Sequence, residues 1–283
     1  MHINYLASIR KNSMGMWGFL LLAIIIFIAI IAPLLPIHSP IEPSVQTLQG
    51  PSKEYWLGTN EIGQDILSRV IYGARTSIAI AFLVGFFTTF LSALIGATSA
   101  LYGGLYERVA MRAADIFLTL PNIIVIILVA SYIRPGIWGL AILLSLIGWQ
   151  GGARVIRAQT LSLKNRAHIY AATAFGADNY YILFKHMVPD LTPILIVQFV
   201  QFARRAVFME AGLAFLGILD PTLISWGIML NRALSFSYLN IWNWLLPPGI
   251  ALSMTILALT FAGYALEEIL NPKLQEKKYV ANH

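Results

Sequence analysis

The chain has 283 residues, of which 58% are hydrophobic and only 11% are charged, and its formal net charge is +6. Soluble domains carry about 25% charged residues, so this composition indicates a protein of the lipid bilayer and excludes an ordinary soluble domain. The absence of cysteine excludes disulfides and thiolate metal sites, and the positive charge does not indicate nucleic acid binding because no basic cluster is interleaved with aromatic residues.

Six stretches are long and apolar enough to cross a bilayer, which takes roughly 20 predominantly apolar residues. Five of them contain no charged residue, and one is counted as a span although it contains Arg204, Arg205 and Glu210. The first stretch is longer than the apolar region of a signal peptide, about 7–15 residues, so we expect it to remain as an anchor. Small residues recur in the second and fourth stretches, which predicts closely packed helices. The predicted spans are residues 17–36, 76–102, 116–133, 135–153, 191–219 and 241–266.

An even number of spans places both termini on one side, and the distribution of Lys and Arg predicts that this side is the cytoplasm. With the N-terminus inside, twelve basic residues fall in inner segments and five in outer segments. The inner residues are Arg10, Lys11, Arg108, Arg112, Arg154, Arg157, Lys164, Arg166, Lys185, Lys273, Lys277 and Lys278. The outer residues are Lys53, Arg69, Arg75, Arg134 and Arg232.

An outer segment between the first two spans begins with several prolines, so it cannot start as regular helix. Further along, the stretch WLGTNEIGQDILSRVIYGARTS places Thr59 as an N-cap, followed by Ile62, Ile66 and Val70 at four-residue spacing. We therefore expect a short interfacial helix here. A connecting loop is the alternative, because so short a helix is marginal on its own.

The loop between spans four and five, IYAATAFGADNYYILFKHMVP, is too polar and too interrupted to cross a membrane. Residues 166–175 are predicted as a short helix that Gly176 ends in the left-handed conformation. Asp178 is predicted as the N-cap of a second helix, which we expect Pro189 to end. Its apolar side chains follow helical spacing and form a face that fits a partner: Tyr180, Leu183, Phe184, Met187 and Val188.

The stretch AATAFGADNYYILFKHMVP resembles the cytoplasmic loop of bacterial ABC-transporter membrane subunits, which docks on the ATPase. The resemblance extends through WLGTNEIGQDILSRVIYGARTSI, RAADIFLTLP, WQGGARVIRAQTLSLK and MEAGLAFLGI, which occur in the order expected of the peptide/nickel permease family. It therefore covers nearly the whole chain. Within that family the sequence is most similar to the second permease subunit.

The resemblance implies an all-α, polytopic permease subunit of an ATP-driven importer in the bacterial inner membrane, with six spans. Residues 1–75 would hold a cytoplasmic tail, the first span and the outer segment. Residues 76–268 would form a five-span core that includes the docking loop, residues 164–189, and residues 269–283 a cytoplasmic tail. The docking residues implied are Ala171, Ala172, Gly176, Ala177, Asp178, Tyr180, Leu183, Phe184, His186 and Pro189.

The chain itself is not expected to be an enzyme, because it lacks a G-x-x-x-x-G-K-[ST] loop, H-E-x-x-H and G-x-S-x-G. The resemblance implies that two cytoplasmic ATPase subunits hold ATP and Mg, and that this chain binds no cofactor or metal. It also implies a second permease subunit in a heterodimer and an extracytoplasmic solute-binding protein. The cargo expected is a dipeptide, an oligopeptide, or a nickel or other metal chelate.

Three positions in the docking loop and the outer motif depart from the family pattern. Tyr170 stands where the docking loop usually has Glu, so we expect docking to depend more on shape. Asn60 and Gln64 stand where the outer motif commonly has Asp and Arg, so an ion pair inferred there from the family is in doubt.

Arg204 and Arg205 lie where the family usually has small residues. A charge at the bilayer centre costs at least ~2.5 kcal/mol, so we expect both to face the bundle interior. One hypothesis is that they line the translocation path and attract carboxylates of the cargo. The alternative is an internal pair with Glu210, which would have a structural role or a transport role.

Asp115 is expected to be structural and to bond to a neighbouring arginine such as Arg112. His168 and His186 are expected to be polar surface contacts, because their separation in sequence and the lack of a nearby carboxylate cluster argue against a metal site.

Two other classes of protein remain alternatives. A passive channel would not need a docking loop. A structural or proton-conducting subunit of a respiratory complex would predict a relay of intramembrane Lys, Glu or His, which the spans lack apart from Arg204, Arg205 and Glu210.

Overall fold

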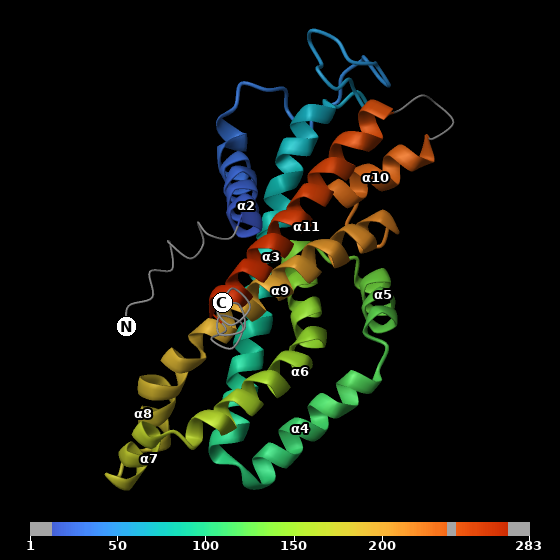
Figure 1. Ribbon diagram of the computed structural model, residues 1–283. Helices are drawn as coiled ribbons and strands as arrows, with labels where there is room; N and C mark the ends of the chain where they lie inside the picture. Colours follow the sequence, from blue (N-terminus) through green and yellow to red (C-terminus); the bar gives the residue numbers. More distant parts are fainter. Residues whose placement is uncertain (1–12, 237–241, 271–283) are drawn as a thin grey trace.

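The computed structural model describes residues 13–236 and 242–270 (Figure 1). These residues form helices and no strand, apart from an isolated bridge between Thr59 and Asp65, which confirms the predicted all-α class. The elements are α2 (Ser13–Ile31), the 3-10 helix η1 (Ala32–Leu34), α3 (Ile66–Tyr102), α4 (Gly104–Thr119), α5 (Asn122–Ile133), α6 (Ile137–Lys164), α7 (Ala167–Ala174), α8 (Asn179–Tyr181), the π-helix η2 (Ile182–Met187), α9 (Val188–Phe215), α10 (Trp226–Ser235) and α11 (Trp242–Leu270).

Five helical segments of the described chain are long and apolar enough to cross a membrane, and α4 with α5 forms a sixth span if the bent pair is counted as one. The two helices meet at 82°. At the bend, Leu120 is extended (φ −77°, ψ 137°), because the ring of Pro121 disfavours helical backbone in the residue before it. The expectation of one continuous helix over residues 116–133 is therefore wrong. Residues 116–119 end α4, and α5 begins after the proline.

The predicted cytoplasmic location of both termini and the boundaries of the three predicted regions stay predictions. The docking loop lies at one end of the molecule, and the outer segment lies at the opposite end (Figure 1). Several positions on which the predicted orientation rests, and the start of the predicted sixth span, lie outside the described residues: Arg10, Lys11, Ile241, Lys273, Lys277 and Lys278.

Residues 37–65 form an outer lobe that ends where α3 begins (Figure 1). Asp65 caps α3 by accepting hydrogen bonds from the amides of Leu67 (3.3 Å) and Ser68 (3.1 Å). Thr59 does not cap a helix; its hydroxyl accepts from the backbone of the lobe instead. The expected short interfacial helix is therefore wrong. The helical pattern after residue 65 belongs to α3, which at 37 residues is roughly 55 Å long and exceeds the ~30 Å hydrocarbon core.

A buried network of amide and guanidinium groups holds the outer lobe on α3. The Gln64 side chain donates to the carbonyl of Ile41 (2.6 Å) and accepts from Asn60 Nδ2 (2.9 Å). Arg69 Nη1 donates to Gln64 Oε1 (2.6 Å) and to the carbonyl of Pro40 (2.9 Å). Asn60 and Gln64, which depart from the family's outer motif, thus form a neutral amide pair. Buried polar groups need such partners, so the network fixes the fold of the lobe.

Replacing Arg69, which is 5% exposed, with methionine is expected to loosen the outer lobe. The change removes hydrogen bonds from a charged donor, which are worth about 1.5–3 kcal/mol. Limited proteolysis should then cleave the lobe at least about tenfold faster, since cleavage follows the population of the opened form. Arg75→Met is the matched control, because Arg75 is exposed and lies over the ring of Tyr72. Equal cleavage of the two variants would contradict the prediction.

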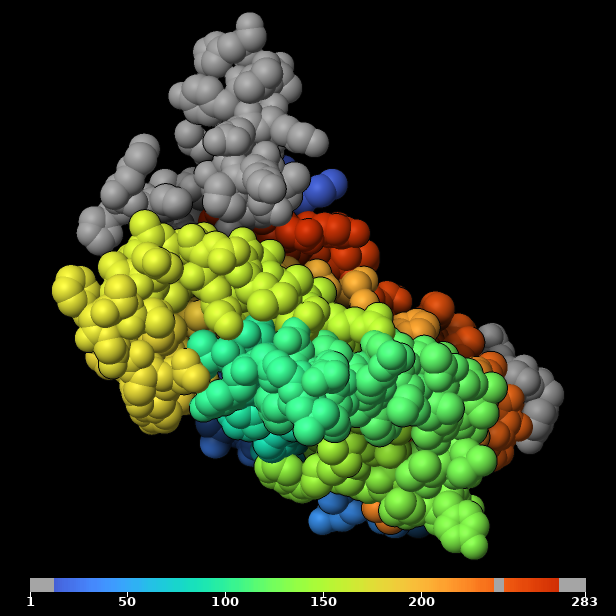
Figure 2. Space-filling model, turned by 90° about the horizontal axis from the view of Figure 1, so that it is seen from below, coloured from blue at the N-terminus to red at the C-terminus, as the bar shows by residue number. Residues whose placement is uncertain are grey.

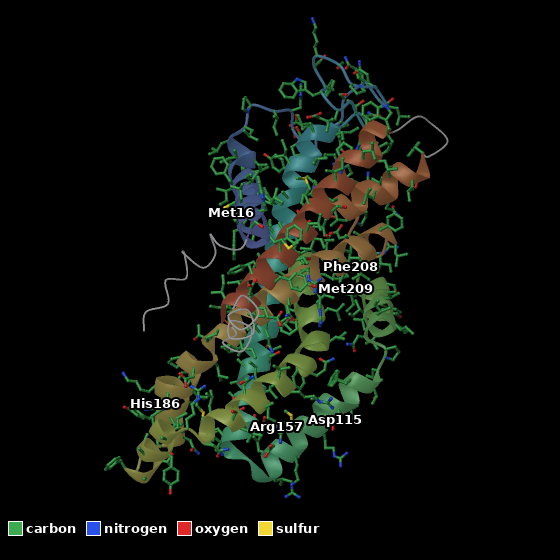
Figure 3. All side chains as sticks on the ribbon, viewed as in Figure 1. Met16, Asp115, Arg157, His186, Phe208 and Met209 are labelled. Carbon is green, nitrogen blue, oxygen red and sulfur yellow. The ribbon has the colours of Figure 1, made fainter. Side chains whose placement is uncertain are left out.

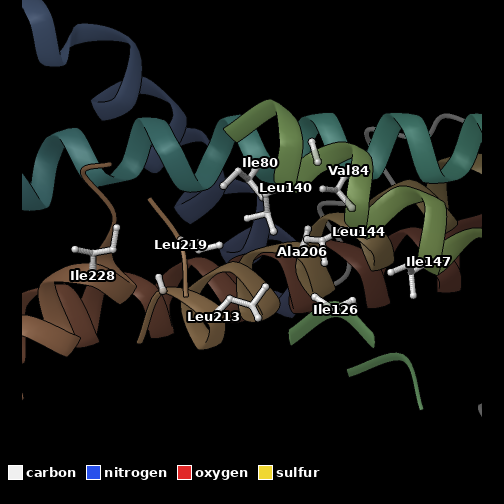
Figure 4. Close-up of a cluster of buried hydrophobic side chains, with 12 residues drawn as sticks. Ile80, Val84, Ile126, Leu140, Leu144, Ile147, Ala206, Leu213, Leu219 and Ile228 are labelled. Atoms are coloured by element: carbon white, nitrogen blue, oxygen red, sulfur yellow. The ribbon is translucent and has the colours of Figure 1, made fainter. Parts of the chain in front are cut away.

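Helices α3, α6 and α9 cross at the centre of the molecule (Figure 1). A cluster of buried apolar side chains fills the space between them (Figure 4). Its members include Ile80 and Val84 of α3, Leu140 and Leu144 of α6, and Ala206 of α9. Burial of this cluster on all sides positions the three helices relative to one another.

Small residues let α3 and α6 approach closely, as the sequence predicted. The Ser92 hydroxyl donates to the backbone carbonyl of Trp149 at 2.9 Å, which joins the two helices directly. A Cβ atom placed on Gly152 would lie 2.4 Å from Ser92 Oγ, and one placed on Gly96 would lie 2.5 Å from the carbonyl oxygen of Ala153. Only glycine fits at these crossings, and the prediction of close packing is confirmed.

Ion pairs join α4 to α6 at the end that carries the docking loop. Arg157 Nε donates to Glu107 Oε1 at 2.6 Å, and Arg154 pairs with Asp115 (Figure 3). The expected structural bond from Asp115 to an arginine is therefore confirmed, but its partner is Arg154 and not Arg112. Because α6 lies against α4, its arginines reach the carboxylates, while Arg112 remains exposed.

Candidate functional site

The docking loop, residues 164–189, lies at the end of the molecule opposite the outer lobe, against the ends of α3 and α6 (Figures 1 and 2). Gly176 ends the first helix with φ +84°, and the amide of Ala177 donates to the carbonyl of Ala172 at 3.0 Å. This is the glycine helix end that the sequence predicts. Asp178 caps the second helix by accepting from the amide of Tyr181 at 3.0 Å, which confirms the predicted N-cap.

The second helix of the docking loop does not end at Pro189, so that prediction is wrong. It passes through the π-helix η2 directly into α9, and residues Asn179–Phe215 form a single helical segment of 37 residues. A proline ring clashes with the preceding turn of an α-helix and has no amide to donate. The wider turn of η2 lies immediately before Pro189 and lets the helix continue. The docking loop and α9 are therefore one continuous body.

A buried cluster attaches the docking loop to the bundle. Ile169, Ile182 and Met187 of the loop pack against Leu101 of α3 and Leu163 of α6. Two polar contacts close the same junction. Arg166 Nη1 donates to Asp190 Oδ2 at 2.9 Å, and Lys164 Nζ donates to the carbonyl of Ala100 at 3.1 Å.

The outward side of the docking loop is aromatic and exposed. The structure brings all ten predicted docking residues onto this element and buries none of them completely: Ala171, Gly176, Asp178, Tyr180, Phe184 and Pro189 are exposed, and Ala172, Ala177, Leu183 and His186 are half-buried. Three further exposed aromatic residues, Tyr170, Phe175 and Tyr181, were not among the predicted docking residues, and Phe175 is 92% exposed. The available signal was a phenylalanine beside a helix-ending glycine, with no apolar partner on its own helix.

His168 and His186 lie closer together than their separation in sequence indicates. Their ring centroids are 5.9 Å apart, and His168 Nε2 lies 3.6 Å from Asp190 Oδ2 (His186 is labelled in Figure 3). Within the described part of the chain, no group of three or more His, Cys, Asp or Glu residues could hold a metal ion.

Replacing Asp178 with alanine is expected to fray the start of the second docking helix. Loss of an N-cap costs about 1 kcal/mol, so amides near Tyr181 should exchange hydrogen about fivefold faster. Asp178→Asn is the control, because asparagine caps as well as aspartate. Hydrogen exchange followed by mass spectrometry measures both variants, and unchanged exchange in the alanine variant would count against the cap.

Arg204 and Arg205 line two different cavities on α9, each of about 180 Å³. Arg205 is exposed and lines the cavity that α9 shares with Thr88 of α3, Asn122 of α5 and residues of α6. Arg204 is half-buried and lines the cavity between α9 and α11, with Glu267. The two guanidinium groups therefore do not act at one point.

Glu210 does not pair with either arginine, so the alternative of an internal pair is wrong. The glutamate is fully buried, and among the described residues neither carboxylate oxygen has a hydrogen-bond partner. Five residues of α-helix separate Arg205 from Glu210, which turns their side chains about 140° apart. Phe208 and Met209 lie on the intervening turn (Figure 3).

The outer face joins the outer lobe to the segments around α10. Arg232 of α10 donates to Glu61 Oε1 (2.9 Å) and to the carbonyl of Pro221 (3.2 Å). In the loop before α10, the backbone amide and the hydroxyl of Thr222 donate to Asp220 and hold the pKa of that carboxyl below its usual value. The lobe itself presents exposed apolar side chains, including Val45 and Trp56.

A groove of about 530 Å³ runs between α6 and α9 as far as the end of α11. Its polar lining residues are Gln159, Arg166, Asp190, Gln198, Gln201 and Glu267. No prediction from the sequence included the three glutamines.

Comparison with known proteins gives consistent matches over most of the chain. Residues 89–276 match the family model described as binding-protein-dependent transport system inner membrane component, and residues 6–51 match the N-terminal TM domain of oligopeptide transport permease C. A peptide permease candidate of Brucella suis is 35% identical over 269 residues, 94% of this chain and 89% of that protein. The dipeptide transport system permease protein DppC of Bacillus subtilis is 32% identical over 270 residues, 94% of this chain and 84% of that protein. The oligopeptide transport system permease protein OppC of the same organism is 32% identical over 272 residues, 94% of this chain and 88% of that protein.

Proposed function

The chain belongs to the family of binding-protein-dependent transport system inner membrane components and is a multi-pass permease subunit of an ABC importer, and from this premise we propose that it imports peptides. The names of the relatives support this cargo, since they are dipeptide and oligopeptide permeases. We propose peptides in preference to nickel or other metal chelates, which none of these names includes.

The proposed assembly contains partners for both ends of the molecule. Two cytoplasmic ATPases hold ATP and Mg, and one of them receives the docking loop of this chain. A second, different permease subunit completes the translocation path, and an extracytoplasmic solute-binding protein delivers cargo to the outer face. The exposed aromatic side of the docking loop supports the first contact, because exposed apolar patches of this kind mark protein interfaces.

The single observation that carries the mechanism is the continuity of the docking loop with α9. When nucleotide closes the ATPases, the docking loop moves as a rigid body and α9 moves with it. The neighbouring spans then tilt between inward-open and outward-open arrangements. Tyr170 fits this proposal as an aromatic contact in place of an acidic one.

The proposed path follows the face that α9 shares with α6. Arg205 lies on this face, so we propose that it attracts the carboxylate of a peptide, whereas Arg204 acts on the side of α11. Glu210 is fully buried and belongs to the packing between helices.

Reconstitution tests the function directly. The chain is co-expressed with the second permease and the ATPases, purified, and placed in proteoliposomes with the loaded binding protein. We expect co-purification of the ATPases and uptake of a labelled dipeptide that requires ATP. Uptake that persists without ATP would favour a passive channel, and purification without any ATPase would overturn the proposal.

A further inference from the structure

The groove between α6 and α9 is polar where its surroundings in the membrane are apolar. Gln198 and Gln201 stand three residues apart on one face of α9, and Gln159 of α6 lines the same groove. Apolar side chains form its walls, including Val155 and Val197. Uncharged amide side chains in a membrane-spanning segment need hydrogen-bond partners, because an unsatisfied polar group is costly in hydrocarbon.

One of these amides is incompletely bonded. Gln198 is 7% exposed, and its Nε2 donates to the backbone carbonyl of Gly152 at 3.4 Å. This contact fixes the side chain against α6. The other atom of the same group, Oε1, is buried and has no hydrogen-bond partner among the described residues. Gln198, which lines the groove, therefore carries a buried acceptor that lacks a donor.

A peptide backbone supplies the donor that this acceptor lacks. The amide of glutamine carries one acceptor and two donors, which match the carbonyl and N–H groups of a peptide bond. Such contacts do not depend on the side chains of the cargo, whereas a charged site would select among them. Three charged groups also line the groove: Arg166 and Asp190 pair with each other where the docking loop joins the bundle, and Glu267 of α11 lines a second cavity together with Gln201.

We propose that Gln159, Gln198 and Gln201 bind the backbone amide groups of a peptide on its way through the permease, with Gln198 Oε1 accepting a peptide N–H. This inference rests on the proposed import of peptides and adds the residues and the chemistry by which the cargo is held. The site serves peptides of different sequence, because it contacts only the groups that all peptides share.

Crosslinking tests whether cargo enters the groove. The chain contains no cysteine, so single cysteines can be introduced one at a time. The probe is a tripeptide, Ala-Cys-Ala, whose thiol is activated as a mixed disulfide with nitropyridine thiol. It is delivered by the binding protein to the intact transporter, in which the accessible cysteines of the partner subunits have been replaced. We expect ATP-dependent crosslinking at Gln201→Cys. Leu146→Cys is the control, because Leu146 is exposed on α6 and does not line the groove.

Paired changes in cargo and protein test the hydrogen bond itself. Trialanine is compared with analogues N-methylated at one peptide bond, which lack that N–H, after the binding protein alone has been shown to hold each with similar Kd. We expect the wild-type transporter to take up at least one analogue about fivefold to tenfold more slowly than trialanine. In Gln198→Met this difference in uptake rate should disappear, because the uptake of trialanine slows and the uptake of the analogue does not.

The outcomes separate the inference from the proposed function. An equal loss of uptake for both cargoes in Gln198→Met, with normal co-purification of the ATPases, would assign Gln198 a structural role and overturn the inference. Absence of crosslinking at Gln201→Cys in a transporter that imports peptide would do the same. Failure of the wild-type complex to import any peptide would instead overturn the proposed cargo.

Discussion

Replacing Phe175 with aspartate is expected to release the ATPase subunits from the purified complex and to abolish ATP-dependent uptake. Phe175 is 92% exposed at the turn between the two docking helices, and none of the described residues covers its ring. Burying a phenylalanine removes about 150–250 Å² from water, and truncating such a residue at the centre of an interface costs about 2 kcal/mol or more. That corresponds to roughly thirtyfold weaker binding, and a buried aspartate adds the cost of its own desolvation.

Two further variants define the result for Phe175. Phe175→Ala should weaken ATPase binding without adding a charge, and its elution as a folded protein shows that the bundle is intact. Tyr132→Ala is the matched control, because Tyr132 is 94% exposed on α5, away from the docking loop (Figure 1). Pull-down of the ATPases measures all three. Retention of the ATPases by Phe175→Asp would show that the docking loop is held through other groups.

Replacing Gly152 with valine is expected to destabilise the bundle strongly. A Cβ atom there would lie 2.4 Å from Ser92 Oγ and 2.9 Å from the ring of Phe202, so three helices must move apart. Overpacking of this kind costs about 1–3 kcal/mol even in cores that relax. The apparent melting temperature of the protein in detergent should fall by about 5 °C or more.

Gly151 is the matched control for Gly152, since it is the neighbouring residue of the same helix. A Cβ atom on Gly151 would meet no other atom within 4 Å. Gly151→Val should therefore leave the melting temperature within about 2 °C of the wild type, because surface substitutions usually change stability by less than 0.5 kcal/mol. A similar loss of stability in both variants would show that helix propensity, and not the crossing of α3 and α6, determines the effect.

Local signals in the sequence predicted local structure well. Asp178 and Gly176 act through backbone groups within five residues of themselves, so their roles as N-cap and helix end follow from residue type and position. Apolar runs predicted the membrane-spanning helices for a similar reason, since length and composition alone decide whether a helix fits a bilayer.

The two prolines show where local signals fail. Pro121 and Pro189 both follow apolar helical patterns, yet the chain bends by 82° at the first and continues as helix through the second. Packing makes the difference. Met187 and Leu191, on either side of Pro189, are buried in a cluster with α3 and α6, which holds the helix in line. Leu120, the residue before Pro121, is exposed and has no such support.

The sequence predicted only the part of the candidate site that is continuous along the chain. The docking loop is continuous in sequence, so its motif could be read directly. The groove is not, because Gln159 and Gln198 are 39 residues apart and meet only after α6 and α9 pack. A usable signal was present in the pair Gln198 and Gln201, which are neutral polar residues at helical spacing inside a predicted span. The contact of Arg154 with Asp115 likewise depends on the packing of α4 against α6.

The uninterrupted segment Asn179–Phe215 has a mechanical consequence for leakage. In the proposed assembly this helical segment runs from the ATPase contact into the membrane-spanning bundle. Because a continuous helix bends little, a displacement of the docking loop moves the other end of α9 at the same time. We therefore expect the two mouths of the pore to open and close in opposite phase, with no interval in which ions or water run down their gradients. Inserting two flexible glycines beside Pro189 should uncouple the movement of the docking loop from that of α9. Proteoliposomes that contain this variant should then lose a proton gradient during turnover.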